Sequence, residues 1–126
     1  MARPLRLWAA CTLLLAAQFA GFGAQAQDTA GYPARPVKII VPFAPAGPTD
    51  TMARLIAQKL SDSLGKQFYI ENVVGAGGNV GSGRAAQAAP DGHTILVTGG
   101  GHVNNPFLYR HVPYDPMRDF EAVTLG

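Results

Sequence analysis

Apolar residues gather in three short runs along the chain, at residues 37–41, 68–71 and 94–98. β-Branched and aromatic side chains are frequent in these runs, which predicts three β-strands. The third run is almost continuously apolar, a pattern typical of a strand that is covered on both faces of its sheet. We therefore expect three strands, with the first and the third buried.

Apolar residues at helical spacing follow the first run. We expect the helix to begin at Thr49 and Asp50, whose side-chain oxygens can accept hydrogen bonds from free amides, and to end at Gly65. Charged residues separate the apolar positions, which favours a helix with one buried face. The apolar positions at helical spacing are Met52, Leu55, Ile56, Leu60 and Leu64.

The rest of the chain alternates in the same way. A second helix, interrupted by glycines, is expected at 79–88, and a turn follows at 89–92. Residues 105–119 are irregular except for one helical turn expected at 107–110, and a further strand begins at 122–125. The order strand, helix, strand, helix, strand predicts an α/β fold with a mainly parallel sheet and right-handed crossovers.

The first 26 residues have the pattern of a cleavable export signal. Arg3 and Arg6 form a positive start, residues 7–19 are apolar, and Ala24-Gln25-Ala26 is a small-x-small cleavage motif. The apolar run is shorter than the roughly 20 residues that span a bilayer, which argues against a membrane anchor. We expect cleavage after Ala26 and a periplasmic mature chain.

Cysteine content and charge change once this segment is removed. Cys11 lies in the middle of the apolar run, where a lipidated cysteine would have ended it, so the mature chain has no cysteine and suits an oxidising compartment. Loss of Arg3 and Arg6 from the ten basic residues leaves eight, against eight acidic residues. A near-neutral chain without a basic cluster has no electrostatic basis for binding nucleic acid.

Three loops follow the expected strands and leave the edge of a parallel sheet where ligands bind. The first ends at Thr49 and Asp50, where free amides and the helix dipole favour an anion. The second, residues 75–79, lets the main chain approach a ligand, and the third, residues 98–102, offers a hydroxyl, glycines and an imidazole. Each loop alone is explained by a tight turn or a helix cap, but three at one edge favour a binding site.

Several motifs occur along the chain in a fixed order. They are Val37-Lys38-Ile39-Ile40-Val41-Pro42-Phe43, Thr49-Asp50, Glu71-Asn72, Gly75-Ala76-Gly77-Gly78-Asn79-Val80-Gly81, Ala89-Pro90-Asp91-Gly92-His93-Thr94, Asn105-Pro106-Phe107-Leu108-Tyr109 and Tyr114-Asp115-Pro116-Met117-Arg118-Asp119-Phe120. In this combination the chain resembles the substrate-binding components of tripartite tricarboxylate transporters, also called the Bordetella uptake gene (Bug) family. The resemblance covers nearly the whole mature chain.

This resemblance implies a periplasmic binding protein of the type II, clamshell fold, with residues 27–126 as an incomplete N-terminal lobe. It implies a monomeric receptor, not an enzyme, that needs no cofactor or metal and delivers a small carboxylate to membrane permease subunits. One ligand carboxylate would lie between the first two loops, partly through ordered water. The ligand-binding residues carried over are Phe43, Ala44, Pro45, Gly47, Thr49, Asp50, Gly75, Ala76, Gly77, Gly78 and Asn79, with Thr98 and His102 as neighbours from the third loop.

The loops depart from the family pattern at a few positions. Where the family has a Gly-Gly pair and a small residue before Thr-Asp, this chain has Ala46, Gly47 and Pro48. Alanine does not adopt a positive φ freely, and proline removes an amide. Val73 and Val74 stand where a basic residue and a proline are common. These departures affect the expected geometry of the loops and, through it, the expected class of ligand.

An enzyme is an alternative from a different functional class. Residues 81–86 match a dinucleotide-binding fingerprint, but they lie inside an expected helix and no acidic residue follows about 20 positions later. Ser82 lacks a hydrolase nucleophile elbow because Val80 replaces its first glycine. A metal site would need His93, His102 and His111, whose nine-residue spacing suits no ligand set. Helix packing explains the small residues more simply.

A product without function is the remaining alternative. The sequence shows no linker or repeat that marks a natural domain end near Gly126, so we expect the chain to stop within its fold. A clamshell encloses its ligand between two lobes, and one lobe with an unfinished sheet supplies half of the contacts. We therefore expect the isolated product to be marginally folded and to bind carboxylates weakly or not at all.

Overall fold

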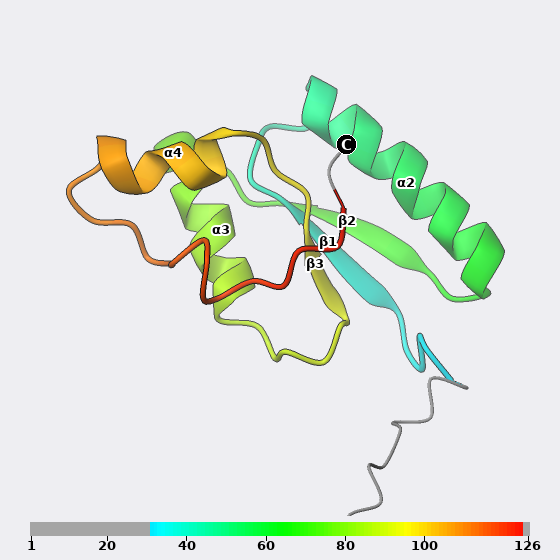
Figure 1. Ribbon diagram of the computed structural model, residues 1–126. Helices are drawn as coiled ribbons and strands as arrows, with labels where there is room; N and C mark the ends of the chain where they lie inside the picture. The colour runs from blue at the N-terminus through cyan, green and yellow to red at the C-terminus, as the bar shows by residue number, and fades with distance from the viewer. Residues whose placement is uncertain (1–30, 125–126) are drawn as a thin grey trace, which may run out of the picture. The chain divides into compact units, whose positions relative to one another are not determined.

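A three-stranded sheet organises residues 31–124, the part of the chain that the computed structural model describes (Figure 1). Its strands are β1 (Val37–Val41), β2 (Phe68–Asn72) and β3 (Thr94–Leu96). The order is β2-β1-β3, and both pairings are parallel. This confirms the predicted parallel α/β fold. The expected export signal lies outside the described residues.

The central strand β1 carries the core. Helices α2 (Pro48–Leu64) and α3 (Asn79–Ala86) cover opposite faces of the sheet (Figure 1). Because side chains alternate along a strand, Ile40 points away from the face that packs on α2. The cluster between β1, β2 and α2 consists of Val37, Ile39, Val41, Ala53, Ala57 and Phe68.

Helix α2 begins before the position that the sequence predicted. Pro48 lies in its first turn, where a missing N–H costs no hydrogen bond, so the expected start at Thr49 is wrong by one residue. The end at Gly65 is confirmed: this residue adopts φ 68°, and its amide donates to the Ser61 carbonyl at 3.0 Å. The helix therefore runs from proline to glycine.

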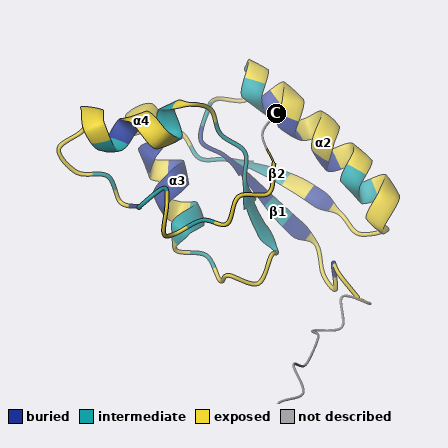
Figure 2. Ribbon diagram, in the orientation of Figure 1, coloured by how far each residue is buried: buried dark blue, intermediate teal, exposed yellow. Residues whose placement is uncertain are grey.

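The predicted buried face of α2 is wrong. Ala53 and Ala57 are buried against the sheet, and Leu60 packs at the margin of the core. Two apolar stripes run along this helix, one of small and one of large side chains. The small alanines let the backbone of the helix approach the sheet closely. Hydrophobicity alone does not distinguish them. The exposed outer side visible in Figure 2 includes Met52, Leu55, Ile56 and Leu64.

The segments after β2 are shorter than expected. A 3₁₀ turn, η2 (Ala76–Gly78), leads into α3, which ends at Ala86 and not at the predicted 88. Strand β3 ends at Leu96 and is only half buried, so its predicted burial on both faces is wrong. The reason is its place in the sheet, where it pairs on one side only among the described residues.

Helix α4 (Gly101–Leu108) replaces the loop and single turn that the sequence predicted. Gly101 at its start and Pro106 are poor helix formers, and together with the preceding Gly99 and Gly100 they concealed it. The strand predicted at 122–125 is wrong for residues 122–124, which are exposed and do not form a strand. Within residues 31–124, every helix is too short or too polar to cross a bilayer.

Candidate functional site

The three loops that follow the strands lie at one edge of the sheet, as the parallel register requires. The first loop (residues 42–47) touches the glycine turn (Gly75–Gly78): a Cβ added at Gly78 would lie 3.5 Å from Pro42 Cβ. The glycine turn in turn meets α4, where Asn105 Nδ2 donates to the Gly77 carbonyl at 3.0 Å. The predicted clustering of loops at this edge is present.

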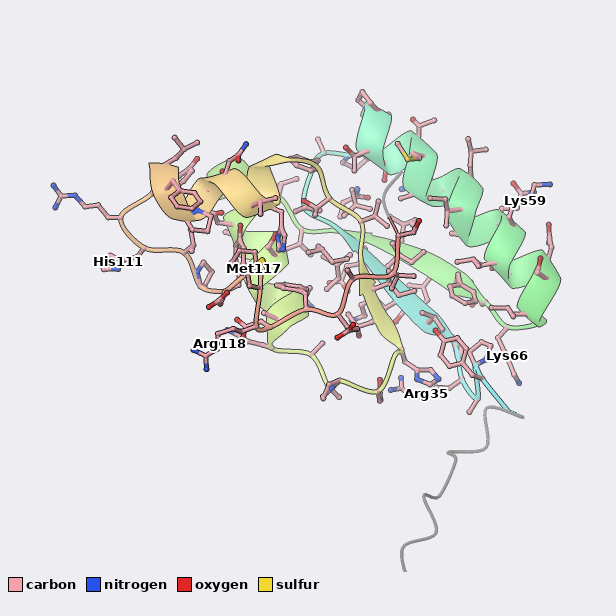
Figure 3. The ribbon with its side chains drawn as sticks, in the orientation of Figure 1. Arg35, Lys59, Lys66, His111, Met117 and Arg118 are labelled. Atoms are coloured by element: carbon pink, nitrogen blue, oxygen red, sulfur yellow. The ribbon has the colours of Figure 1, made fainter. Side chains whose placement is uncertain are left out.

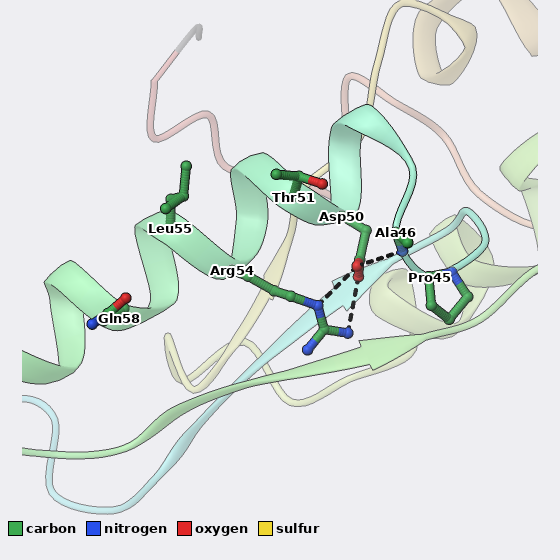
Figure 4. A pocket seen from close by; sticks show the side chains of 7 residues that line it. All are labelled: Pro45, Ala46, Asp50, Thr51, Arg54, Leu55 and Gln58. Carbon is green, nitrogen blue, oxygen red and sulfur yellow. Dashed lines mark hydrogen bonds and ion pairs between the residues drawn. The ribbon is translucent and has the colours of Figure 1, made fainter.

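Asp50 joins the first loop to the neighbouring strand. Its side chain is 1% exposed, and its Oδ2 accepts hydrogen bonds from the Ala46 amide at 2.9 Å and Arg54 Nε at 2.8 Å (Figure 4). Its Oδ1 accepts from Asn72 Nδ2 at 2.8 Å and Arg54 Nη2 at 3.1 Å. Asn72 Nδ2 also donates to the Phe43 carbonyl at 3.0 Å. We call these residues the Asp50 brace.

These hydrogen-bond donors determine the pKa of Asp50. The hydrogen bond from Arg54 is the largest cause that lowers the pKa of Asp50 from 3.8 to about 2, followed by those from Asn72 and the Ala46 amide. Burial opposes the shift by disfavouring the charged form. Both carboxylate oxygens are engaged within the fold. What the Asp50 side chain can contribute to a nearby ligand is therefore the position of the first loop.

Main-chain amides supply the positive surface at this edge. Within the described residues, the amides of Gly47, Thr49, Asp50, Ala76 and Gly77 donate to no carbonyl or side chain. Those at the start of α2 add the favourable dipole of the helix. An anion that reached this edge would find several N–H donors that belong to the main chain.

The conformation of Ala46 shows how this chain accommodates an alanine where the family pattern has a glycine. Ala46 adopts φ 63°, a left-handed conformation that costs an alanine about 1–2 kcal/mol. Its bond to Asp50 and the buried position of that carboxylate hold it there. The loop thus reaches a positive φ without the usual glycine, and Pro48 fits the first helical turn beyond it.

A second group of polar side chains lies behind the glycine turn. Asn79 Oδ1 accepts from Asn105 Nδ2 at 2.7 Å. The single hydrogen of Tyr114 Oη is shared between the His102 carbonyl at 2.9 Å and Asn79 Oδ1 at 3.3 Å. Asn79, Asn105 and Tyr114 are all buried. The sequence interpretation missed Asn105 and Tyr114 as parts of the site. Their signal was a polar residue inside each of two recognised motifs.

His102 and Ser82 also belong to this buried group. The imidazole stacks on Tyr114 with ring centroids 4.7 Å apart, meets the edge of Phe120, and lies 3.3 Å from Ser82 Oγ through Nδ1. Burial lowers the pKa of His102 and raises that of Tyr114. Ser82 is 1% exposed, which leaves no access for an ester or amide substrate. Thr98 follows β3 at intermediate burial.

The open surface near the site is shallow. A groove of about 480 Å³ lies between the first loop and the outer side of α2, and it does not include the glycine turn (Figure 4). The described part of the chain thus presents an open edge, not an enclosed cavity. The groove is lined by Pro45, Ala46, Asp50, Thr51, Arg54, Leu55 and Gln58.

Metal ligands do not gather among residues 31–124, where no three His, Cys, Asp or Glu side chains come together. His111 points away from the body of the fold (Figure 3). His93 lies beside Tyr32, with ring centroids 5.3 Å apart, and bonds to Asp91. The three histidines therefore have separate surroundings.

Comparison with known proteins gives a consistent result. Residues 52–125 match the family described as tripartite tricarboxylate transporter family receptor. A UPF0065 protein of Agrobacterium vitis is 45% identical over 113 residues, which are 90% of this chain and 32% of that protein. Protein BugT of Bordetella pertussis is 40% identical over 99 residues, which are 75% of this chain and 29% of that protein.

Solved structures agree with these relatives. The periplasmic binding protein BugD matches with a TM-score of 0.69 and 44% identity over 71% of this chain and 30% of its own. MatC of Rhodopseudomonas palustris, solved with bound malate, matches with a TM-score of 0.66 and 47% identity over 71% of this chain and 31% of its own. Another R. palustris protein, solved with adipate, matches with a TM-score of 0.66 and 40% identity over 68% of this chain and 29% of its own. The chain spans about a third of the length of the curated relatives it matches.

Proposed function

Because the chain belongs to the tripartite tricarboxylate transporter family of receptors, also called the Bug family, we propose that it forms the carboxylate-anchoring part of a periplasmic solute receptor. The relatives are periplasmic binding proteins and not enzymes, and two similar proteins were solved with malate and adipate. The structural observation that carries the proposal is the set of unpaired amides in the first loop and the glycine turn, side by side at one edge.

One carboxylate of the ligand lies between these two loops in our proposal. The amides at the start of α2 and those of the glycine turn donate to its oxygens, and no positive side chain is required. Thr98 and His102 come from the third segment as less direct neighbours. The contributing residues are Phe43, Ala44, Pro45, Gly47, Thr49, Asp50, Gly75, Ala76, Gly77, Gly78 and Asn79.

In our proposal the remaining contacts come from the part of the receptor that corresponds to the rest of the relatives' length. The relatives are about three times as long, and a second lobe would close over the ligand and set much of its selectivity. In our proposal the receptor is exported by cleavage after Ala26, acts as a monomer, and passes its ligand to membrane permease subunits. Residues 31–124 alone should bind weakly, because only half of the contacts are present.

A titration of the purified chain followed by amide NMR tests the proposal. Malate and adipate should produce saturable shifts at Gly47, Thr49, Ala76 and Gly77, with dissociation constants in the millimolar range, about 4 kcal/mol of binding free energy. Malamide, the neutral diamide of malate, is the matched control and should produce none. Equal shifts with malamide would contradict anion recognition by these amides, and no response to any carboxylate would favour a product without function.

A further inference from the structure

The glycine turn has an unusual backbone conformation, although the amides of Gly78 and Val80 both donate to the Gly75 carbonyl, at 3.0 and 3.4 Å. Four consecutive residues have positive φ: Gly75 at 142°, Ala76 at 48°, Gly77 at 63° and Gly78 at 96°. L-residues avoid this region, and glycines are flexible within it. A turn of this kind keeps one shape only where its surroundings determine it.

Contacts hold the turn from three directions. A Cβ added at Gly75 would lie 2.8 Å from Val80 Cγ2, within the turn's own helix. One added at Gly78 would lie 3.6 Å from Phe43 Cζ in the first loop. One added at Gly77 would lie 2.6 Å from Tyr109 Oη, at the end of α4. Packing thus limits the turn, but packing alone does not set the direction of its peptide groups.

Asn105 supplies that direction. Among the described residues it is the side chain that bonds the main chain of the turn, with Nδ2 donating to the Gly77 carbonyl at 3.0 Å. The same Nδ2 donates to Asn79 Oδ1 at 2.7 Å, so both of its hydrogens are used. Asn105 is also only 6% exposed. With both hydrogens used and the side chain buried, it has no donor left for a ligand. Its bond holds the carbonyl of the peptide that joins Gly77 to Gly78, while the N–H of the same peptide donates to the Gly75 carbonyl at 3.0 Å.

The acceptor is itself held in place. Tyr114 Oη, whose hydrogen is shared with the His102 carbonyl, lies 3.3 Å from Asn79 Oδ1, and the Tyr114 ring stacks on His102 from α4. A buried polar group of this kind is either fully bonded or costly. The ordinary explanation is that these side chains only satisfy one another within the core. The bond to Gly77 goes further, because it reaches an exposed turn that faces the proposed ligand.

We infer that Asn105 is a positioning residue: it orients the glycine turn so that the amides of Ala76 and Gly77 face a carboxylate, and it does not touch the ligand itself. This inference rests on the proposed function. It makes α4 part of the binding apparatus, although its residues lie about thirty positions after the turn. A shift of α4 would change carboxylate affinity through this one side chain.

The test replaces the donor without changing the shape of the side chain. Asn105→Asp keeps the size and removes the Nδ2 donor, whereas Asn104→Asp adds the same charge at the exposed neighbouring position of α4. Two quantities are measured for the full chain: hydrogen exchange of the Gly78 amide, which donates to Gly75 within the turn, and the dissociation constant for malate by NMR titration. If Asn105→Asp does not fold, Asn105→Leu with Asn104→Leu gives the same comparison without a buried charge.

Support requires both quantities to change in the Asn105 variant. Gly78 exchange should become faster and the malate dissociation constant should rise, each about tenfold, as expected for one lost hydrogen bond, while the Asn104 variant stays within about twofold. Faster exchange with unchanged affinity would overturn the inference and leave Asn105 a structural residue. Unchanged exchange would overturn it as well. If the unmodified chain does not respond to malate, the proposed function fails first, and the inference fails with it.

Discussion

Asp50 Oδ2 accepts a hydrogen bond from the Arg54 guanidinium, one turn further along α2, and from the amide of Ala46, one turn before it. A single carboxylate therefore ties the start of the helix to the loop that precedes it. The negative charge is matched inside the fold and is not presented at the edge. An acidic residue can thus stand within a proposed carboxylate site without repelling its ligand.

Asp50→Asn tests the brace directly. The amide group cannot accept four hydrogen bonds from three residues as the carboxylate does, so the first loop should loosen. The melting temperature should fall by several degrees, and malate binding should weaken. Thermal unfolding by circular dichroism measures the first effect, and NMR titration measures the second. Asp62→Asn, at an exposed position of the same helix, is the control and should change neither.

Acid should remove this contribution in a defined range. The folded pKa of about 2 is lower than the ordinary 3.8, so the unfolded chain binds the proton first and the stabilisation is complete above pH 3.8. It is lost as the pH falls from about 4 to about 2. Urea unfolding across this range should show a smaller pH dependence for Asp50→Asn than for the unmodified chain, and equal slopes would contradict the assignment.

His102 predicts a second pH effect near neutrality. Burial lowers its folded pKa below 6.5, so the protonated form is favoured in the unfolded chain. Stability should be complete above pH 6.5 and decline as the pH falls below it. His102→Gln should flatten this part of the stability curve, measured by urea unfolding, whereas the exposed His111→Gln should leave it as it is.

Ala46→Gly should make the chain more stable. Glycine adopts the observed φ of 63° without a Cβ penalty, and part of this gain is offset by its greater freedom in the unfolded state. The expected net gain in the free energy of unfolding is about 0.5–1 kcal/mol. Ala44→Gly lies in the same loop outside the positive-φ positions, so it should bring no gain. A loss of stability in Ala46→Gly would argue against a strained loop.

The face of α2 that meets the sheet can be checked by exchanging sizes. Ala53→Leu should lower the free energy of unfolding by about 1–3 kcal/mol, because extra methylenes do not fit between helix and sheet. Leu55→Ala should change it by less than about 0.5 kcal/mol, because Leu55 is 62% exposed. If urea unfolding showed a larger loss for Leu55→Ala than for Ala53→Leu, the face that hydrophobicity predicted would be the one that packs on the sheet.

Local signals explain which parts of the fold were predictable. β1 is a β-branched run between prolines, and Gly65 ends a helix by its own backbone freedom, so both follow from neighbouring residues. The gathering of three loops at one edge follows from parallel strands alone. The buried face of α2 depends on how closely a helix approaches a sheet, which Ala53 and Ala57 decide only in three dimensions.

The site shows the same division. Gly75, Gly77 and Gly78 indicated a place where main chain could meet a ligand, and the unpaired amides of Ala76 and Gly77 lie there. Asn105 and Tyr114 were not predicted because their partners are distant in sequence: Asn105 bonds from α4 to Gly77 and Asn79, more than 25 positions earlier. Helix α4 itself was hidden by its glycines and Pro106, since packing on the turn, and not helix propensity, stabilises it.

The donors at this edge belong to the backbone, and that affects how such a protein can evolve. A point mutation at Gly47, Ala76 or Gly77 exchanges a side chain and leaves the N–H in place, except when it introduces proline. Inherited variation can therefore redirect these groups but rarely delete them. In our proposal, related receptors can therefore come to bind different acids while they keep the same backbone donors for one carboxylate. The changes in ligand preference then come from the residues that contact the rest of the ligand.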